Sequence, residues 1–155
     1  KQLTKVMGPE AVALCTSNLG AIVRAQLATC GMDANVFGGG LTMQEDVLQD
    51  GAPQLKPNPA PYTRALGMLG RPAGSTVAVE DSVVGVRSAV AAGVGVVLGV
   101  LNRGDDEQAR RDGAQATGEL LAAGAYGVFG TTREAIDWII EHASSRVASV
   151  AGAPV

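Results

Sequence analysis

The sequence predicts an α/β fold in which a Rossmann-like parallel sheet is flanked by helices. Apolar runs of strand length alternate with segments whose apolar residues recur at helical spacing, as in βαβ units. The chain is 46% hydrophobic but only 3% aromatic, so its buried residues are mostly small or β-branched, which suits parallel strands covered on both faces. Because 155 residues suit one domain and no repeat or linker divides them, we expect a single domain over residues 1–155.

The individual elements follow from apolar spacing and from residues that begin or end helices. Asn18 and Asn58 are the expected N-caps of the first two helices, and Gly31 is expected to end the first. Thr131 and Glu134 predict a capping box at the start of the last helix. The predicted strands are 11–15, 76–79, 94–100 and 126–129, and the predicted helices are 19–30, 59–70, 83–92, 107–123 and 131–150. Loops are expected at 38–40 and 103–105, and a frayed tail after residue 150.

Composition and charge exclude several classes of partner. No apolar run reaches the roughly 18 to 20 residues that a membrane span requires, so no membrane partner is expected. The formal net charge is -3 and the twelve Lys and Arg residues are scattered, which argues against nucleic acid. The chain starts at Lys1 without an initiator methionine or a signal peptide, so we expect a cytoplasmic protein and interpret the chain as a fragment. The sequence does not predict the oligomeric state.

The few thiol and imidazole groups restrict the chemistry further. Cys15 and Cys30 lack the paired spacing of zinc sites and are expected to be reduced and buried. His142 falls in the last predicted helix, far from any other candidate, and is expected to be a solvated surface residue. A Ser-His-Asp hydrolase or a histidine-ligated zinc enzyme is therefore excluded. Any chemistry must use carboxylates, hydroxyls and lysine.

Three polar clusters follow predicted strands or precede predicted helices. They are Thr16-Ser17-Asn18, Lys56 beside a proline-rich turn, and the adjacent acids Glu80 and Asp81. Taken singly, each cluster has a simpler structural interpretation. The first would cap a helix, Lys56 would be a surface lysine, and Glu80 and Asp81 would be solvated acids of a loop. Together they are more informative, because the carboxyl ends of parallel strands meet at one edge of the sheet. Hydroxyls and helix-start amides there could hold phosphate oxygens, and two adjacent carboxylates favour a hard cation such as Mg²⁺.

This order of motifs resembles the haloacid dehalogenase-like (HAD) superfamily, especially its branch of β-phosphoglucomutase-like and sugar-phosphate phosphatases. Thr16, with Ser17 and Asn18 beside it, matches the hydroxyl motif that binds the transferring phosphoryl group. Lys56 in Lys-Pro-Asn-Pro matches the lysine motif that neutralises the phosphoryl group. Glu80 and Asp81 match the acidic motif that holds Mg²⁺. The resemblance runs from about residue 11 to residue 138.

The resemblance implies an aspartyl-phosphate intermediate, yet the nucleophile motif of the family is not found in this chain. That motif is a hydrophobic strand ending in Asp-x-Asp-Gly and should precede Thr16, but nothing in residues 1–11 resembles it. Asp33, Asp46 and Asp50 come after Thr16, and none of them ends a hydrophobic strand. The helical cap that the family inserts before the hydroxyl motif is also not found. We therefore expect an N-terminally incomplete core with no nucleophile of its own.

The missing motif has a structural consequence. In the family, the nucleophile strand lies in the centre of the sheet, between the strand that ends at Thr16 and the strand that ends at Glu80. Without it, these two strands must either pair with each other or leave backbone groups unpaired, at about 1 to 3 kcal/mol for each buried unsatisfied group. We therefore expect a fold of low stability unless the missing segment is supplied.

The resemblance implies the C-terminal core of a Mg²⁺-dependent phosphatase or phosphomutase. Its substrate would be a small phosphorylated metabolite, with a sugar phosphate as one candidate, and the chain alone is expected to be inactive. One alternative is a non-catalytic HAD-derived protein that serves binding or assembly. Another is a hydrolase of the 2-haloacid dehalogenase type, which needs no metal and would not be expected to keep Glu80 and Asp81. Because the cap selects the substrate in this family, the sequence does not identify it.

Overall fold

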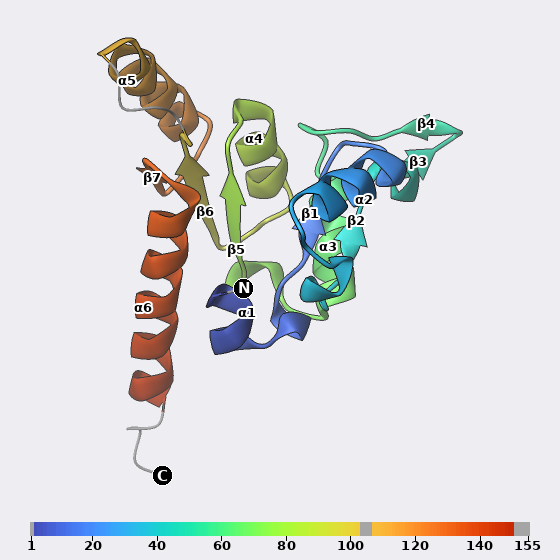
Figure 1. Cartoon of the computed structure of the whole chain (residues 1–155), viewed down its shortest axis with the longest axis horizontal. Coiled ribbons are helices and arrows are strands. Elements are labelled where there is room, and N and C mark those ends of the chain that lie inside the picture. Colours follow the sequence, from blue (N-terminus) through green and yellow to red (C-terminus); the bar gives the residue numbers. More distant parts are fainter. Residues whose placement is uncertain (1, 103–106, 151–155) are drawn as a thin grey trace.

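The computed structural model describes residues 2–102 and 107–150 and confirms the predicted α/β fold (Figure 1). Its largest described sheet contains β5 (Val77–Glu80), β6 (Val96–Val100) and β7 (Gly127–Phe129), which are parallel and lie in that order. The longest of them, β6, forms in a run of small and apolar residues, Val-Val-Leu-Gly-Val. The turn predicted at 103–105 lies outside the described residues, as does the tail after residue 150.

Two smaller sheets come from the first third of the chain. In one, β1 (Leu14–Cys15) pairs in parallel with β2 (Leu41–Thr42). In the other, β3 (Leu48–Gln49) and β4 (Ala52–Pro53) form an antiparallel hairpin. The two residues of the hairpin turn, Asp50 and Gly51, both have positive φ angles, of 52° and 78°, as tight hairpin turns require.

Helices cover both faces of the β5-β6-β7 sheet, as expected of a doubly wound fold. On one face, Ala78 and Val97 pack against Val86 of α4. On the opposite face, Leu98 and Val100 pack against α6. The α-helices are α1 (Gln2–Met7), α2 (Gly20–Thr29), α3 (Ala60–Leu69), α4 (Val83–Ala91), α5 (Glu107–Ala122) and α6 (Thr132–Val150). The short 3-10 helices are Pro9–Ala11, Ala34–Val36, Gln44–Asp46 and Ala73–Ser75.

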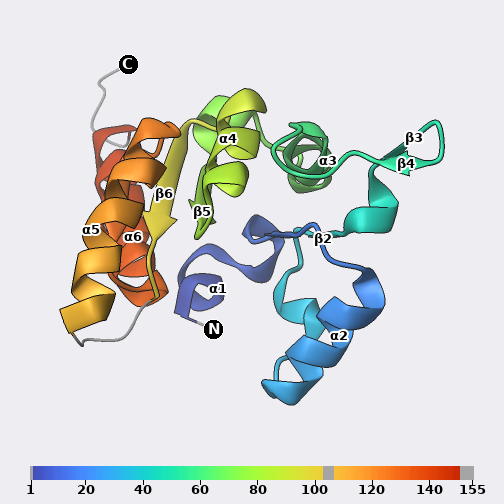
Figure 2. The same cartoon turned by 90° about the horizontal axis from the view of Figure 1, so that it is seen from above.

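The strands β1 and β5 each have one edge without a strand partner in the described part of the chain. β1 pairs only with β2, and β5 pairs only with β6. Figures 1 and 2 show β1 and β2 with α2 and α3 on one side of the molecule, and β5 and β6 with α5 and α6 on the other. In the described part of the chain, β1-β2 and β5-β6-β7 are therefore two separate parallel sheets.

Three helix ends show how well the capping residues were predicted. The expected capping box is confirmed: Glu134 N donates to Thr131 Oγ1 over 3.2 Å, and Thr131 N donates to Glu134 Oε2 over 3.3 Å. The N-cap position of α3 is Pro59, one residue after the predicted Asn58, but Asn58 Oδ1 accepts a hydrogen bond from Ala60 N, the first residue of α3, over 2.9 Å. Gly31 follows the end of α2 with a φ of 61°, which confirms its role as a stop.

The prediction that Asn18 caps α2 is wrong. The N-cap position is Leu19, which makes no side-chain cap, and α2 begins at Gly20. The carboxylate of Glu45 accepts from Gly20 N over 2.9 and 3.1 Å and takes the place of the cap. The predicted strand 11–15 is shorter than expected, since β1 covers only Leu14–Cys15 and Ala11 belongs to the 3-10 helix Pro9–Ala11. In the described part of the chain, no helix is long and apolar enough to cross a membrane.

Candidate functional site

A cavity of about 760 Å³ lies between β1 and β5 and contains most of the predicted site. One wall is formed by residues 11–16 and another by residues 76–81. Thr16, Asn18, Lys56, Glu80 and Asp81 all line this cavity. The structure therefore brings residues from three separate segments of the sequence to the carboxyl ends of two strands, as the sequence analysis expected.

Lys56 connects the carboxyl ends of β1 and β5. Its Nζ donates to Cys15 O over 3.1 Å and forms an ion pair with Glu80 Oε1 at 2.5 Å. The side chains of Lys56 and Glu80 are only 11% and 7% exposed. A buried charge of either sign requires a partner, so the two residues depend on each other. The plain interpretation of Lys56 as a surface lysine is therefore wrong.

Three polar contacts position the loop that carries Lys56. The backbone N of Lys56 donates to Ser17 Oγ over 3.4 Å. Ser88 of α4, which is fully buried, donates from Oγ to Asn58 O over 2.6 Å. Because Asn58 also caps α3, this loop is attached to the β1 end, to α3 and to α4 at once. A small shift of one element would therefore move the ammonium group.

Tyr62 is a third member of the Lys56 and Glu80 pair. The buried Tyr62 hydroxyl donates to Glu80 Oε1, the same oxygen that accepts from Lys56. The ammonium group of Lys56 also lies 5.1 Å from the centroid of the Tyr62 ring. Burial, reinforced by the negative charge of Glu80, raises the pKa of Tyr62 well above its usual range. Tyr62 therefore stays a hydrogen-bond donor throughout the neutral pH range.

The predicted phosphate-binding residues Thr16, Ser17 and Asn18 directly follow β1, and Thr16 and Asn18 line the cavity. Thr16 is half-buried, and its Oγ1 accepts from Asn18 N over 3.1 Å, so the hydroxyl proton is left for another acceptor. Ser17 is also half-buried and contacts Lys56 through the bond described above. Asn18 lines the cavity but is exposed. This arrangement supplies hydroxyl donors close to a fixed cation.

The two predicted metal ligands lie in different environments. Glu80 is buried and its Oε1 is already held by Lys56 and Tyr62, whereas Asp81 is exposed at the cavity wall. Across the described residues there is no group of three or more His, Cys, Asp or Glu side chains that could hold a metal ion. Mg²⁺ usually binds through one or two carboxylates and completes its shell with water and phosphate oxygens. The donor set of Asp81 and Glu80 therefore has the right chemistry for Mg²⁺ but supplies only part of a shell.

Among the described residues, Glu80 and Asp81 are the only acidic residues that line the cavity. Asp33 caps a 3-10 helix through Asn35 N, and Asp46 accepts from Met43 N. Asp50 belongs to the hairpin turn. None of these three aspartates matches the nucleophile motif in the sequence, and in the structure each belongs to a local turn or cap away from the cavity.

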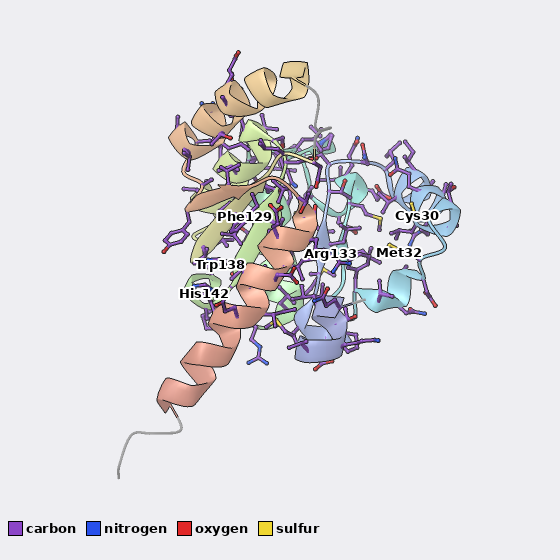
Figure 3. All side chains as sticks on the ribbon, turned by 60° about the vertical axis from the view of Figure 1, so that its left-hand side comes forward. Cys30, Met32, Phe129, Arg133, Trp138 and His142 are labelled. Atoms are coloured by element: carbon purple, nitrogen blue, oxygen red, sulfur yellow. The ribbon has the colours of Figure 1, made fainter. Side chains whose placement is uncertain are left out.

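The two cysteines and His142 differ in their exposure to solvent. Cys15 and Cys30 are both free, but only Cys15 is partly buried, so the prediction of burial is wrong for Cys30. Burial raises the pKa of the Cys15 thiol to about 11. His142 is exposed as expected and stacks on Trp138 with ring centroids 4.0 Å apart. Figure 3 shows His142 and Trp138 on α6, on the other side of the molecule from Cys30.

Sequence reasoning missed Tyr62, Ser88 and Gly85, which all support Glu80 or the Lys56 loop. The only signals were a tyrosine in the first turn of α3 and small residues in α4. Gly85 is needed because a Cβ at this position would overlap the carboxylate of Glu80. Overpacking of this kind usually costs about 1 to 3 kcal/mol.

We expect Gly85→Ala to displace the Glu80 carboxylate from Lys56 and Tyr62. Native-state hydrogen exchange of α4 amides should become about tenfold faster, which corresponds to roughly 1.4 kcal/mol. Gly118→Ala is the matched control, because it also lies in a helix but a Cβ there would meet no atom within 4 Å. This control should slow exchange of α5 slightly, since alanine favours helix. Equal effects of the two variants would contradict the role given to Gly85.

Comparison with solved structures identifies the architecture. A β-phosphoglucomutase candidate from Thermotoga maritima matches with a TM-score of 0.60 and 26% identity, over 82% of this chain and 51% of that one. A haloacid dehalogenase-like protein of unknown function from Agrobacterium tumefaciens matches with a TM-score of 0.64 and 21% identity, over 96% and 58%. A HAD family hydrolase from Deinococcus radiodurans, solved with bound phosphate and sodium, matches with a TM-score of 0.64 and 23% identity, over 86% and 54%.

These matches bear on the fold and on its extent. They share the HAD-like core, and they include the β-phosphoglucomutase-like branch. The chain spans only 51 to 58% of the length of these three proteins. No protein-family model and no curated protein sequence matches the chain.

Proposed function

We propose that the chain is the phosphoryl-binding core of a Mg²⁺-dependent phosphatase or phosphomutase. Its fold is the core fold of the HAD-like superfamily, and the similar structures include a member of the β-phosphoglucomutase-like branch. The substrate would be a small phosphorylated metabolite, with a sugar phosphate as the first candidate. The observation that carries this proposal is the convergence of Thr16, Lys56 and Asp81 on one cavity at the carboxyl ends of two strands. The bound phosphate of the Deinococcus radiodurans protein supports it.

Each residue of the chain has a role that its contacts allow. Lys56 supplies the positive charge that offsets a phosphoryl group, and it is held in place by Cys15 O and Glu80. The hydroxyl groups of Thr16 and Ser17 donate to phosphoryl oxygens, and backbone amides near the start of α2 add to them. Tyr62 keeps the carboxylate of Glu80 satisfied when Lys56 turns toward a phosphoryl oxygen.

Asp81 and Glu80 would hold Mg²⁺ together with water and phosphoryl oxygens. When bound, Mg²⁺ neutralises the negative charge that the transferred group carries. Asp81 is the more available ligand because it is exposed, whereas one oxygen of Glu80 already accepts two hydrogen bonds. The reaction of the family passes through an aspartyl-phosphate. The cavity wall supplies no third carboxylate among the described residues, so we expect this chain alone to bind phosphate without turning over.

Binding of inorganic phosphate in the presence of Mg²⁺ tests the proposed function. We expect Thr16→Val to weaken phosphate binding about tenfold or more, because a hydrogen bond to a charged group contributes about 1.5 to 3 kcal/mol. Isothermal titration calorimetry of the full chain measures this affinity. Thr29→Val is the matched control, since Thr29 is an exposed threonine of α2 whose hydroxyl only donates to Ala25 O. Equal affinity of the Thr16→Val variant and the unchanged chain would contradict the proposal.

A further inference from the structure

The ammonium group of Lys56 keeps one N–H donor for a ligand in the cavity. A lysine ammonium group has three donors and no acceptor. Among the contacts of the described residues, one of them donates to Cys15 O over 3.1 Å and another to Glu80 Oε1 over 2.5 Å. Lys56 and Thr16 both line the cavity, so the third donor is available to a phosphoryl group there as long as no other acceptor takes it.

The carboxylate of Glu80 is the acceptor that competes for this third donor. Glu80 is buried, so its attraction for the ammonium group is only weakly screened by water and salt. Its Oε2 lies directly against α4, since a Cβ at Gly85 would overlap this oxygen. Each carboxylate oxygen accepts about two hydrogen bonds. Oε1 already accepts one from Lys56 and one from Tyr62, so its acceptor positions are filled.

Tyr62 contacts both members of this ion pair. It is a buried residue in the first turn of α3, the helix that begins directly after the Lys56 loop. Its hydroxyl donates to Glu80 Oε1, and its ring lies under the ammonium group, with Lys56 Nζ 5.1 Å from the ring centroid. The hydroxyl and the ring therefore act on the pair separately, and a phenylalanine would keep only the second contact.

We propose that Tyr62 is a positioning residue whose hydroxyl sets the affinity of Lys56 for a phosphoryl group. The hydroxyl fills an acceptor position on Glu80 that the third proton of Lys56 would otherwise take, and it offsets part of the negative charge that repels phosphate. Without the hydroxyl, Lys56 turns further toward Glu80, because the carboxylate is held against Gly85. This inference rests on the proposed phosphoryl binding and adds the residue that controls its cation.

Phosphate binding by a Tyr62→Phe variant of the full chain tests the inference. Because phenylalanine keeps the ring beside Lys56, we expect the fold to be retained and the affinity for inorganic phosphate, measured by calorimetry, to fall about tenfold. The fall should be the same with and without Mg²⁺, since it acts through Lys56. Tyr126→Phe is the matched control. Tyr126 is the second of the two tyrosines, is 71% exposed and does not line the cavity, so this variant should bind phosphate as the unchanged chain does.

The side-chain nitrogen signal of Lys56 in nuclear magnetic resonance reports the position of the cation itself. In the unchanged chain, phosphate should shift this signal. In the Tyr62→Phe variant the signal should be displaced before phosphate is added, and phosphate should then shift it less. A role of Tyr62 in packing alone would speed the hydrogen exchange of α3 amides and leave both the Lys56 signal and the phosphate affinity unchanged.

Several results would overturn the inference. Equal phosphate affinities of the two tyrosine variants would do so, as would a loss of affinity that appears only with Mg²⁺, because the effect would then act through the metal. A Lys56 nitrogen signal that is the same in the Tyr62→Phe variant and in the unchanged chain would do so too. In each of these cases the unchanged chain still binds phosphate and the proposed function stands. An unchanged chain that binds no phosphate would overturn the proposed function and this inference together.

Discussion

Replacing Lys56 by methionine is expected to destabilise the region around the site by about 3 to 5 kcal/mol, because it leaves the buried Glu80 without its charged partner. Native-state hydrogen exchange of α3 and β5 amides should then become on the order of 100-fold faster or more. The double variant Lys56→Met with Glu80→Gln should recover most of this loss, since it removes both charges and keeps an acceptor for Tyr62.

An exposed ion pair elsewhere in the described part of the chain provides the comparison for this prediction. Arg64 Nη2 lies 3.9 Å from Asp46 Oδ1, and the two side chains are 51% and 25% exposed. Arg64→Met should therefore change local stability by less than about 1 kcal/mol. If Lys56→Met changes local stability by less than about 1 kcal/mol as well, the buried ion pair between Lys56 and Glu80 does not stabilise this region as described. A double variant whose α3 and β5 amides exchange as fast as those of Lys56→Met would also contradict the pairing of Lys56 with Glu80.

Thermal unfolding of the isolated chain is expected to lack one cooperative transition in the range of about 45 to 65 °C that is typical of mesophile domains. The β1-β2 and β5-β6-β7 sheets are separate, and a cavity of about 760 Å³ lies between β1 and β5. Trp138, the only tryptophan, lies in α6 and packs against the β5-β6-β7 side. Its fluorescence therefore reports that part alone, whereas far-ultraviolet circular dichroism reports the whole chain.

The two signals should give midpoints that do not coincide, because two-state unfolding would require both parts to melt together. The part that contains β1 and β2 should melt first, since each of these strands has only two residues. One sharp transition in the mesophile range, seen equally by both signals, would show that the two sheets unfold together as one stable unit. That result would contradict the expectation of low stability.

The second half of the fold was more predictable from sequence than the first. The strands β5, β6 and β7 are apolar runs followed by helices with clear starts, so local signals and tertiary packing agree. The strand β2 was missed because it has two residues after three glycines and exists only through its pairing with β1. The false cap at Asn18 has a similar cause, since the group that caps α2 is Glu45, which is 25 residues away along the chain.

The site was predictable as a set of residues but not as a set of contacts. The position of polar clusters after strands was enough to place Thr16, Lys56 and Asp81 on one cavity. That Lys56 would be bonded directly to Glu80 could not be predicted, because it depends on the path of the loop after β4. The supporting role of Tyr62 depends on the tertiary placement of α3, from which its hydroxyl reaches Glu80 at the end of β5, and no local pattern in the sequence records that placement.

Residue-specific mapping of phosphate binding tests the central claim most directly. The claim is that the carboxyl ends of β1 and β5 form a phosphoryl-binding site around Lys56. Two-dimensional nuclear magnetic resonance of the labelled chain, titrated with inorganic phosphate in the presence of Mg²⁺, should show amide shifts concentrated at Thr16, Ser17, Lys56 and Asp81, with β7 unaffected. Shifts confined to other parts of the surface, or none at saturating phosphate, would contradict the claim.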